Sequence, residues 1–187
     1  LAKEFGFKVQ ALEHAWEAYK IADELTAAKV GISVFADSWA YKMEAAEGIA
    51  YDAGYCTKKG VLVSINSDSA ERIRRLFNDA SKTMKYGGLT ENEALSLITI
   101  NPALQLGVEK IVGSLEVGKQ GDIAIFNEHP MSAYTRCEMT IIEGDSGLIL
   151  IGPLLTAETA HAALELYFQH RPRQPVRAVI YSHSHAD

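Results

Sequence analysis

The sequence lacks the features that mark several specialised classes of protein. It has only two cysteines, Cys56 and Cys137, which are far apart and outside any Cys-x-x-Cys pattern, so we expect free thiols rather than a disulfide or a cysteine metal site. Its longest strongly apolar stretch, residues 147–155, is far too short to cross a bilayer. No lysine and arginine cluster is present, and the net charge of −6 argues against a nucleic-acid partner.

The remaining composition is that of a globular protein. Hydrophobic residues make up 48% of the chain, enough to bury a core, and 187 residues suit one domain or two small ones. The first residue is Leu1 rather than Met, and residues 1–6 resemble the tail of a helix. We therefore expect a piece of a larger protein. No signal peptide is visible, but the localisation stays open because an upstream segment could carry one.

Strands and helices alternate over the first two thirds of the chain. Apolar runs predict strands over residues 8–12, 31–35 and 61–66. Helical spacing predicts helices over residues 16–29, 41–56 and 69–86, the last ended by Gly87-Gly88, and a Thr90–Glu93 capping box predicts a helix that runs to Asn101-Pro102. This alternation indicates successive β/α units of a parallel sheet or barrel.

The sequence pattern changes after residue 112, where the alternation of strands and helices ends. A glycine-punctuated stretch leads to predicted strands over residues 123–126, 139–143 and 148–151, with a hairpin turn at Gly144-Asp145. A helix over residues 156–170 has Thr156 or Ala157 near its N-cap, and an apolar strand follows from residue 176. No internal repeat is present.

Two residues at predicted strand ends could bind a metal ion. His14 follows the first strand and Asp68 follows the third, and functional groups of a β/α barrel lie at the carboxyl ends of its strands. Such a pair could share one divalent ion, and the carboxylate could accept a proton from bound water. From spacing alone other interpretations stay open, because a His at a strand end is more often structural and an Asp before a helix is most often its N-cap.

The local sequences resemble metal-dependent amidohydrolases of the imidazolonepropionase-like branch. The similar segments are residues 13–25, 35–42, 64–71, 85–90, 101–103 and 113–122. The resemblance implies an α/β fold in which residues 1–104 are the back half of a (β/α) barrel and residues 105–138 are a small β segment. It further implies that His14 is a metal ligand, that Asp68 is the catalytic, metal-proximal aspartate, and that a metal-activated water attacks a C–N bond. The remaining family ligands would lie before Leu1.

The last part of the chain resembles the start of a metallo-β-lactamase fold, closest to the alkyl sulfatase branch. Residues 139–187 predict a ββαβ piece that ends in Ser-His-Ser-His-Ala-Asp, a spacing typical of metal ligands. The resemblance implies that His183 and His185 bind one zinc and that Asp187 helps to bind a second. A solvated tail remains an alternative, and Gly152 stands where that family usually has an aspartate.

These segments leave three interpretations of function. We favour a hydrolase of the amidohydrolase class, acting on a small molecule with zinc or another divalent metal, with both sites incomplete in this chain. A zinc-dependent alkyl sulfatase-like hydrolase and a non-catalytic fragment or chimera, which could form an oligomer that covers the open barrel edge, are the alternatives. The two patterns meet near Arg136 to Met139, where a chimeric reading frame is favoured over a natural fusion.

Incomplete ligand sets predict that the chain alone holds metal poorly and has no useful turnover. Two protein ligands leave half of a four-coordinate zinc sphere to water, so the ion exchanges easily. Atomic emission of the purified and dialysed chain should find well below one equivalent of zinc. One tightly held equivalent at His14 and Asp68 would contradict this expectation.

Overall fold

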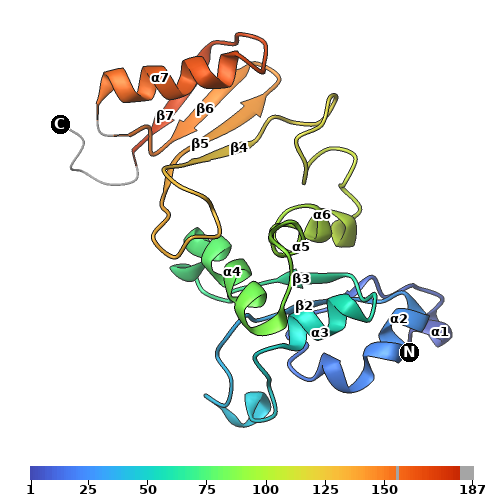
Figure 1. Cartoon of the computed structure of the whole chain (residues 1–187). Coiled ribbons are helices and arrows are strands. Elements are labelled where there is room, and N and C mark those ends of the chain that lie inside the picture. The colour runs from blue at the N-terminus through green and yellow to red at the C-terminus, as the bar shows by residue number, and fades with distance from the viewer. Residues whose placement is uncertain (155, 182–187) are drawn as a thin grey trace. The chain divides into compact units, whose positions relative to one another are not determined.

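The computed structural model describes residues 1–154 and 156–181 (Figure 1). Its contacts divide the chain into two compact units, Leu1–Ser114 (unit 1) and Leu115–Asp187 (unit 2). Each unit has its own sheet and its own apolar core. The two units are therefore described separately.

Unit 1 is built around a three-stranded parallel sheet in the order β1-β2-β3. The strands are β1 (Ala11–Leu12), β2 (Gly31–Val34) and β3 (Val63–Ile65), so the first is much shorter than predicted. The helical elements are α1 (Ala2–Phe5), η1 (Ala18–Ile21), α2 (Ala22–Ala28), η2 (Met43–Ala45), α3 (Asp52–Lys58), η3 (Arg72–Arg75), α4 (Leu76–Gly87), α5 (Glu91–Ser96) and α6 (Ile100–Leu106). The predicted alternation of parallel strands and helices is confirmed, and unit 1 has a mixed α/β fold.

Alternate residues of β2 and β3 form the core of unit 1. Ile32, Val34, Val63 and Ile65 are almost fully buried and pack in one cluster with α2, α3 and the residues after α5. Side chains on a strand alternate between the two faces, so these four point to the same layer of helices. Cys56 of α3 lies in this cluster as a free thiol, as predicted.

A buried carboxylate ties η1 to α3 within the same core. Asp52 is only 3% exposed, and its Oδ1 accepts hydrogen bonds from the Tyr19 N–H at 2.9 Å and the Cys56 thiol at 3.3 Å. Burial raises the pKa of Asp52 to about 6, because desolvation disfavours the charged form more than the two hydrogen bonds favour it. This group therefore belongs to the packing of unit 1.

Three predicted helices have different bounds in the structure. The single helix predicted over residues 41–56 is wrong, because only η2 and α3 form there. Gly48 lies between these two elements, and glycine is a poor helix former. The helix expected from residue 69 begins at Arg72. The helix expected to end at Asn101-Pro102 is instead divided into α5 and α6, with Pro102 in the first turn of α6, where proline is tolerated.

The predicted helix boundary signals are confirmed. Thr90 and Glu93 form both halves of a capping box, and Gly88 ends α4 in a left-handed conformation with φ of 63°. In unit 2, the Thr156 hydroxyl accepts a hydrogen bond from the Thr159 N–H at 3.3 Å and caps α7. Local side-chain chemistry therefore fixes these ends.

Unit 2 is a four-stranded sheet in the order β4-β5-β6-β7 with one helix. Its elements are β4 (Ile123–Phe126), β5 (Cys137–Gly144), β6 (Gly147–Ile151), α7 (Ala157–Phe168) and β7 (Val176–Ile180). The β5–β6 pair is the predicted hairpin, and β7 pairs with β6 in parallel after the α7 crossover. Met139, Ile141, Leu148 and Leu150 pack against Tyr167 of α7.

Strand β5 joins the two predicted segments of unit 2. It pairs with β4 on one side and with β6 on the other, so residues 105–138 and residues 139–187 contribute strands to one sheet. The division at residue 138, between segments that resemble two different families, remains a prediction. In the folded chain, hydrogen bonds run across it.

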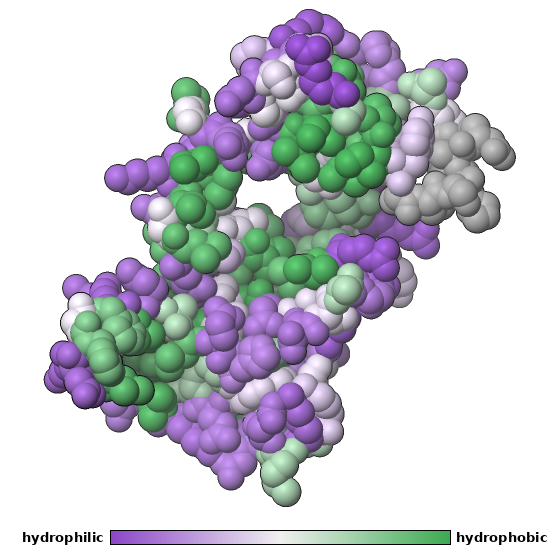
Figure 2. Space-filling model, turned by 180° about the vertical axis from the view of Figure 1, so that it is seen from behind, coloured by the Kyte–Doolittle hydropathy of each residue, from purple (hydrophilic) through white to green (hydrophobic). Residues whose placement is uncertain are grey.

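Apolar side chains also gather on the surfaces of both units (Figure 2). In unit 1, Phe5, Ile73 and Leu106 each expose more than half of their surface, and in unit 2 Tyr134 and Tyr181 do the same. Among the described residues, no helix is both long and apolar enough to span a bilayer.

The close approach of α3 and α4 at Gly54 predicts a sensitive position. A Cβ on Gly54 of α3 would lie 2.4 Å from the Gly87 Cα of α4, so Gly54→Ala must push the two helices apart. We expect a loss of about 1–3 kcal/mol in the free energy of unfolding, which exceeds the gain of about 1 kcal/mol from the better helix propensity of alanine. Urea unfolding measures this change.

The matched control is Gly144→Ala, whose Cβ would meet its nearest neighbour at an ordinary 3.5 Å. It should change stability much less. Equal effects of the two substitutions would show that the α3–α4 contact is not as close as the structure places it.

Candidate functional site

Three loops leave the carboxyl edge of the unit 1 sheet and carry polar side chains. His14 lies two residues after β1, Asp37 three residues after β2, and Asp68 three residues after β3. The strands are parallel, so their carboxyl ends meet at one edge. Groups that are distant in sequence are thereby gathered at one place.

The structure brings His14 and Asp68 together. The distance between His14 Nε2 and Asp68 Oδ2 is 3.9 Å, and the two side chains are 47% and 63% exposed. An ion pair this exposed contributes little to stability, typically about 0–1 kcal/mol. The approach of the two side chains therefore adds little to the stability of the fold.

Each loop at this edge contains a residue in the left-handed backbone region. The φ angles are 54° for His14, 74° for Ser38 and 45° for Asp68. Residues other than glycine avoid this region, at a cost of about 1–3 kcal/mol each, and such strain gathers at functional sites. Three strained residues at one sheet edge therefore indicate a functional edge.

Aromatic rings fix one side of His14. Its imidazole meets the Phe35 ring edge-on, with 5.2 Å between the ring centroids. The same Phe35 ring stacks on Trp16, with 4.3 Å between their centroids. The Trp16 indole N–H is buried without a hydrogen-bond partner among the described residues. These contacts restrict the direction of the His14 ring and leave its Nε2 facing Asp68.

Each of the two residues lines an open pocket. His14 lines one of about 480 Å³ together with Trp16 and Glu44. Asp68 lines one of about 500 Å³ with Asn66, Ser67 and Ile73. Solvent and small molecules can therefore reach both side chains.

The pair fits a divalent ion as a partial ligand set. Two donors that bind one tetrahedral zinc at about 2.1 Å lie about 3.4 Å apart. The separation of 3.9 Å is about 0.5 Å longer, which a rotation of the exposed side chains can close. An imidazole nitrogen and a carboxylate oxygen are donors that zinc accepts. Among residues 1–154 and 156–181, however, no group of three or more His, Cys, Asp or Glu side chains is placed to hold a metal.

The helix-cap interpretation of Asp68 is wrong. The helical segment that follows begins at Arg72, and its N-cap position is Glu71. Asp68 instead has a left-handed backbone and directs its carboxylate to His14. Its role is therefore not to satisfy the start of the next helix.

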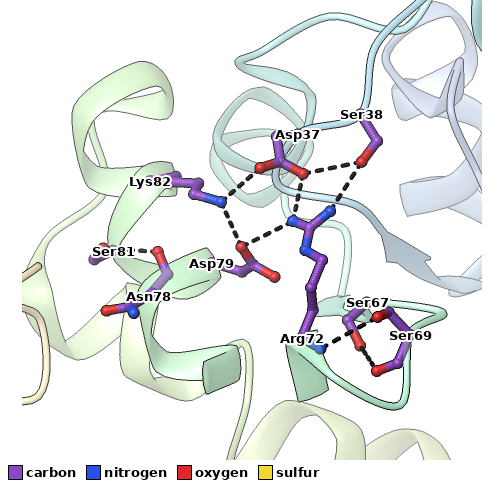
Figure 3. Close-up of polar contacts among 9 residues, drawn as sticks. All are labelled: Asp37, Ser38, Ser67, Ser69, Arg72, Asn78, Asp79, Ser81 and Lys82. Atoms are coloured by element: carbon purple, nitrogen blue, oxygen red, sulfur yellow. Dashed lines mark hydrogen bonds and ion pairs between the residues drawn. The ribbon is translucent and has the colours of Figure 1, made fainter. Parts of the chain in front are cut away.

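A four-membered ionic network lies beside this pair and was not predicted from the sequence. Figure 3 shows Asp37, Arg72, Asp79 and Lys82 pointing toward one another. Arg72 donates to both carboxylates, at 3.1 Å for Asp79, and Lys82 donates to Asp37 at 2.5 Å and to Asp79 at 2.6 Å. Arg72 and Lys82 lie 35 and 45 positions after Asp37 in the sequence, and no local pattern signals the pairing.

The network keeps Asp37 ionised. Partial burial opposes its charge, but hydrogen bonds from Lys82 and Arg72 outweigh burial and lower the pKa of Asp37 below its ordinary value of 3.8. The same contacts raise the pKa of Lys82 and Arg72 against the effect of their burial. All three groups are charged at neutral pH.

The predicted ligands of the second site, His183, His185 and Asp187, lie outside the described residues. The structure does describe the strand that leads to them, β7, and the loop after β6 beside it. The Gly152 N–H donates to the Ile180 carbonyl at 2.9 Å, so these two segments are adjacent. The second site therefore remains a prediction.

Comparison with family models finds two matches in this chain. The model of the amidohydrolase family matches residues 43–147, more than half of the chain. The model of the metallo-beta-lactamase superfamily matches residues 135–187. Both resemblances seen in the sequence are confirmed, and the matches overlap over residues 135–147, which contain all of β5.

Curated relatives reflect both matches. An (R)-specific secondary-alkylsulfatase from Pseudomonas is 50% identical over 104 residues, covering 54% of this chain and 14% of the relative. The amidohydrolase tasK of Hapsidospora irregularis is 26% identical, covering 84% and 17%. A probable imidazolonepropionase from Xenopus tropicalis is 40% identical over 75 residues, covering 37% and 17%. The chain thus spans less than a fifth of each of these relatives.

Solved structures support the amidohydrolase fold. An amidohydrolase from Thermotoga maritima superposes with a TM-score of 0.67 at 31% identity, covering 75% of this chain and 37% of that one. An adenosine deaminase from Xanthomonas campestris, solved with bound zinc, gives a TM-score of 0.58 at 17% identity, covering 89% and 44%. The latter likeness concerns the fold alone.

The ionic network predicts a pH-dependent contribution to stability. Because the pKa of Asp37 is lowered on folding, its contribution is present above the ordinary value of 3.8 and is lost as the pH falls through the folded pKa. Asp37→Asn should therefore destabilise the protein at pH 7, by about 1–3 kcal/mol since it leaves two cations with one carboxylate, and should cost nothing at low pH. Urea unfolding across pH measures the difference.

Asp23→Asn is the control, because Asp23 pairs with a single lysine, Lys59, and is 76% exposed. Its stability should follow that of the unchanged protein at every pH. A pH-independent effect of Asp37→Asn would contradict the charge-based account of the network.

Proposed function

The chain belongs to the amidohydrolase family, and from this premise we propose that unit 1 is the back part of a (β/α) barrel that hydrolyses a C–N bond with a divalent metal. The observation that carries the proposal is the 3.9 Å approach of His14 and Asp68 at the carboxyl edge of a parallel sheet. Barrel enzymes use this edge for chemistry. The proposed substrate is a small molecule with an amide or cyclic amide bond.

Each of the two residues has a definite role in this proposal. A bound zinc or similar ion supplies an activated water and polarises the bond under attack. The His14 Nε2 holds the ion, in an orientation that the Phe35 ring supports. The Asp68 carboxylate takes the proton from the water and delivers it to the leaving nitrogen, which is general base and then general acid catalysis.

The remaining ligands are proposed to come from segments other than the described residues. The pair supplies two donors, whereas a catalytic zinc usually has three protein ligands. The segments that supply these ligands would also cover the edges of the sheet, because its outer strands β1 and β3 have no further strand partner among the described residues. An oligomer, with exposed side chains such as Phe5 and Ile73 at its contact, is another way to cover unit 1.

A second candidate function is hydrolysis of alkyl sulfate esters by unit 2. It is favoured by the 50% identity with the Pseudomonas alkylsulfatase. The β6–α7–β7 unit would deliver His183, His185 and Asp187 to a zinc site at the end of β7. The two functions differ in substrate, an amide or cyclic amide against a sulfate ester.

Substitution of Asp68 tests the first function directly. The full open reading frame that encodes residues 1–187 is expressed with zinc and assayed on amides, cyclic imides and alkyl sulfates. Asp68→Ala should lower kcat for C–N hydrolysis by about 10²–10⁴-fold, the range for loss of a general acid–base group. Turnover of alkyl sulfates should be unchanged if unit 2 carries it.

Glu71→Gln is the matched control, since Glu71 lies three residues from Asp68 and pairs only with Arg75 in the structure's ion pairs. It should keep full activity on both substrate classes. C–N hydrolysis that survives Asp68→Ala, or its absence from the whole protein, would sink the proposed function.

A further inference from the structure

We infer that Arg72 is a positioning residue for Asp68: its guanidinium anchors the β3–α4 loop so that the Asp68 carboxylate is held against His14. The inference rests on the proposed function, because it assigns to Arg72 an effect on the same metal-binding pair. Arg72 itself does not contact His14 or Asp68 in any hydrogen bond or ion pair of the described residues. It acts through the loop.

The first step of the argument is the turn that contains Asp68. Before it, the Asn66 N–H donates to the Val34 carbonyl of β2 at 2.9 Å, which fixes the start of the loop to the sheet. After it, the Arg72 N–H donates to Ser69 Oγ at 3.2 Å, and Ser67 Oγ donates to the Ser69 carbonyl at 3.3 Å (Figure 3). Asp68 lies between these two fixed points.

The second step is the strain at the apex of this turn. Asp68 has a φ of 45°, a conformation that costs free energy for any residue other than glycine. A short polar turn alone would relax to a commoner backbone conformation. Contacts outside the turn must therefore hold it, and the side chain of Arg72 provides them.

The third step is the set of hydrogen bonds that fix the Arg72 side chain. Its guanidinium donates to Asp37 and, at 3.0 Å, to Ser38 Oγ, both on the loop after β2, and to Asp79 on α4 at 3.1 Å. The Asp79 side chain is only 5% exposed. A planar fork with five donors can satisfy three acceptors in fixed directions, which an ammonium group cannot do equally well.

The result is a direct connection between the loops of β2 and β3. Ser38 and Asp68 are both in left-handed conformations, and Arg72 joins the loop of the first to the loop of the second. Lys82 neutralises the second negative charge of the pair Asp37 and Asp79, so the Arg72 fork is held without net charge. Removal of Arg72 frees the turn to relax and Asp68 to turn away from His14.

A double-mutant cycle on zinc affinity tests the inference without any activity assay. The 187-residue chain carrying His183→Ala and His185→Ala, which removes the proposed second zinc site, serves as the reference. This chain and its Arg72→Ala, Asp68→Ala and doubly substituted variants are titrated with zinc chloride against a zinc-chelating dye at pH 7. Arg72→Ala should weaken zinc binding about tenfold, within the range for groups that orient ligands. In the Asp68→Ala background it should change affinity less than about twofold, because coupled residues are not additive.

Two further variants separate positioning from general stability. Arg75→Ala removes a neighbouring arginine of η3 whose ion pair among the described residues is with exposed Glu71, and it should leave zinc affinity unchanged. Arg72→Lys keeps the charge but not the fork and should recover part of the lost affinity. Circular dichroism confirms that each variant is folded, and Arg72→Lys carries the test if Arg72→Ala is not.

The outcomes distinguish the inference from the function on which it rests. Loss of affinity on Asp68→Ala with none on Arg72→Ala or Arg72→Lys overturns the positioning role and leaves the proposed site intact. An equal loss from Arg72→Ala in both backgrounds also overturns it, since the effect then does not pass through Asp68. No loss on Asp68→Ala means that the pair does not bind zinc, and both proposals fail.

Discussion

The parallel pairing of β1, β2 and β3 is the constraint on which the rest of unit 1 depends. The register matches Ala11 to Gly31 and Ile32 to Val63, so the three strands end at one edge and their loops leave it side by side. The same pairing sends Ile32, Val34, Val63 and Ile65 to the helical layer. Burial of these four side chains, each worth about 1.5–3 kcal/mol, stabilises the sheet that holds the exposed pair His14 and Asp68.

Strain and charge at this edge offset one another. Left-handed residues in three loops cost free energy, and the ionic network of Asp37, Arg72, Asp79 and Lys82 holds two of these loops in place. Because Asp79 is buried, its charge must be matched, so the four groups have little freedom to rearrange. A rigid support of this kind is what a site needs when its own residues contribute almost no stability.

Much of the fold follows from local sequence signals, and the site does not. Apolar runs locate the strands, although β1 is shorter than predicted, and the Thr90–Glu93 capping box and Gly88 predict helix ends correctly because neighbours in sequence decide them. The helix predicted over residues 41–56 forms only in part, as η2 and α3 on either side of Gly48. The Arg72–Asp37 pairing spans 35 positions and has no local signal. The strand-end positions of His14 and Asp68 made them candidates, and only a family resemblance gave them definite roles. Strand β5 lies within both family matches and pairs with a strand on each side.

The central claim is that His14 and Asp68 bind the same ion at the sheet edge. Crystals of the chain soaked in zinc chloride, with anomalous data collected at the zinc absorption edge, measure this directly. The account predicts an anomalous peak about 2.0–2.2 Å from both His14 Nε2 and an Asp68 carboxylate oxygen, with water at the other positions. Zinc bound only at other histidines, or a His14 side chain turned away from Asp68 in the zinc-soaked crystal, would contradict it.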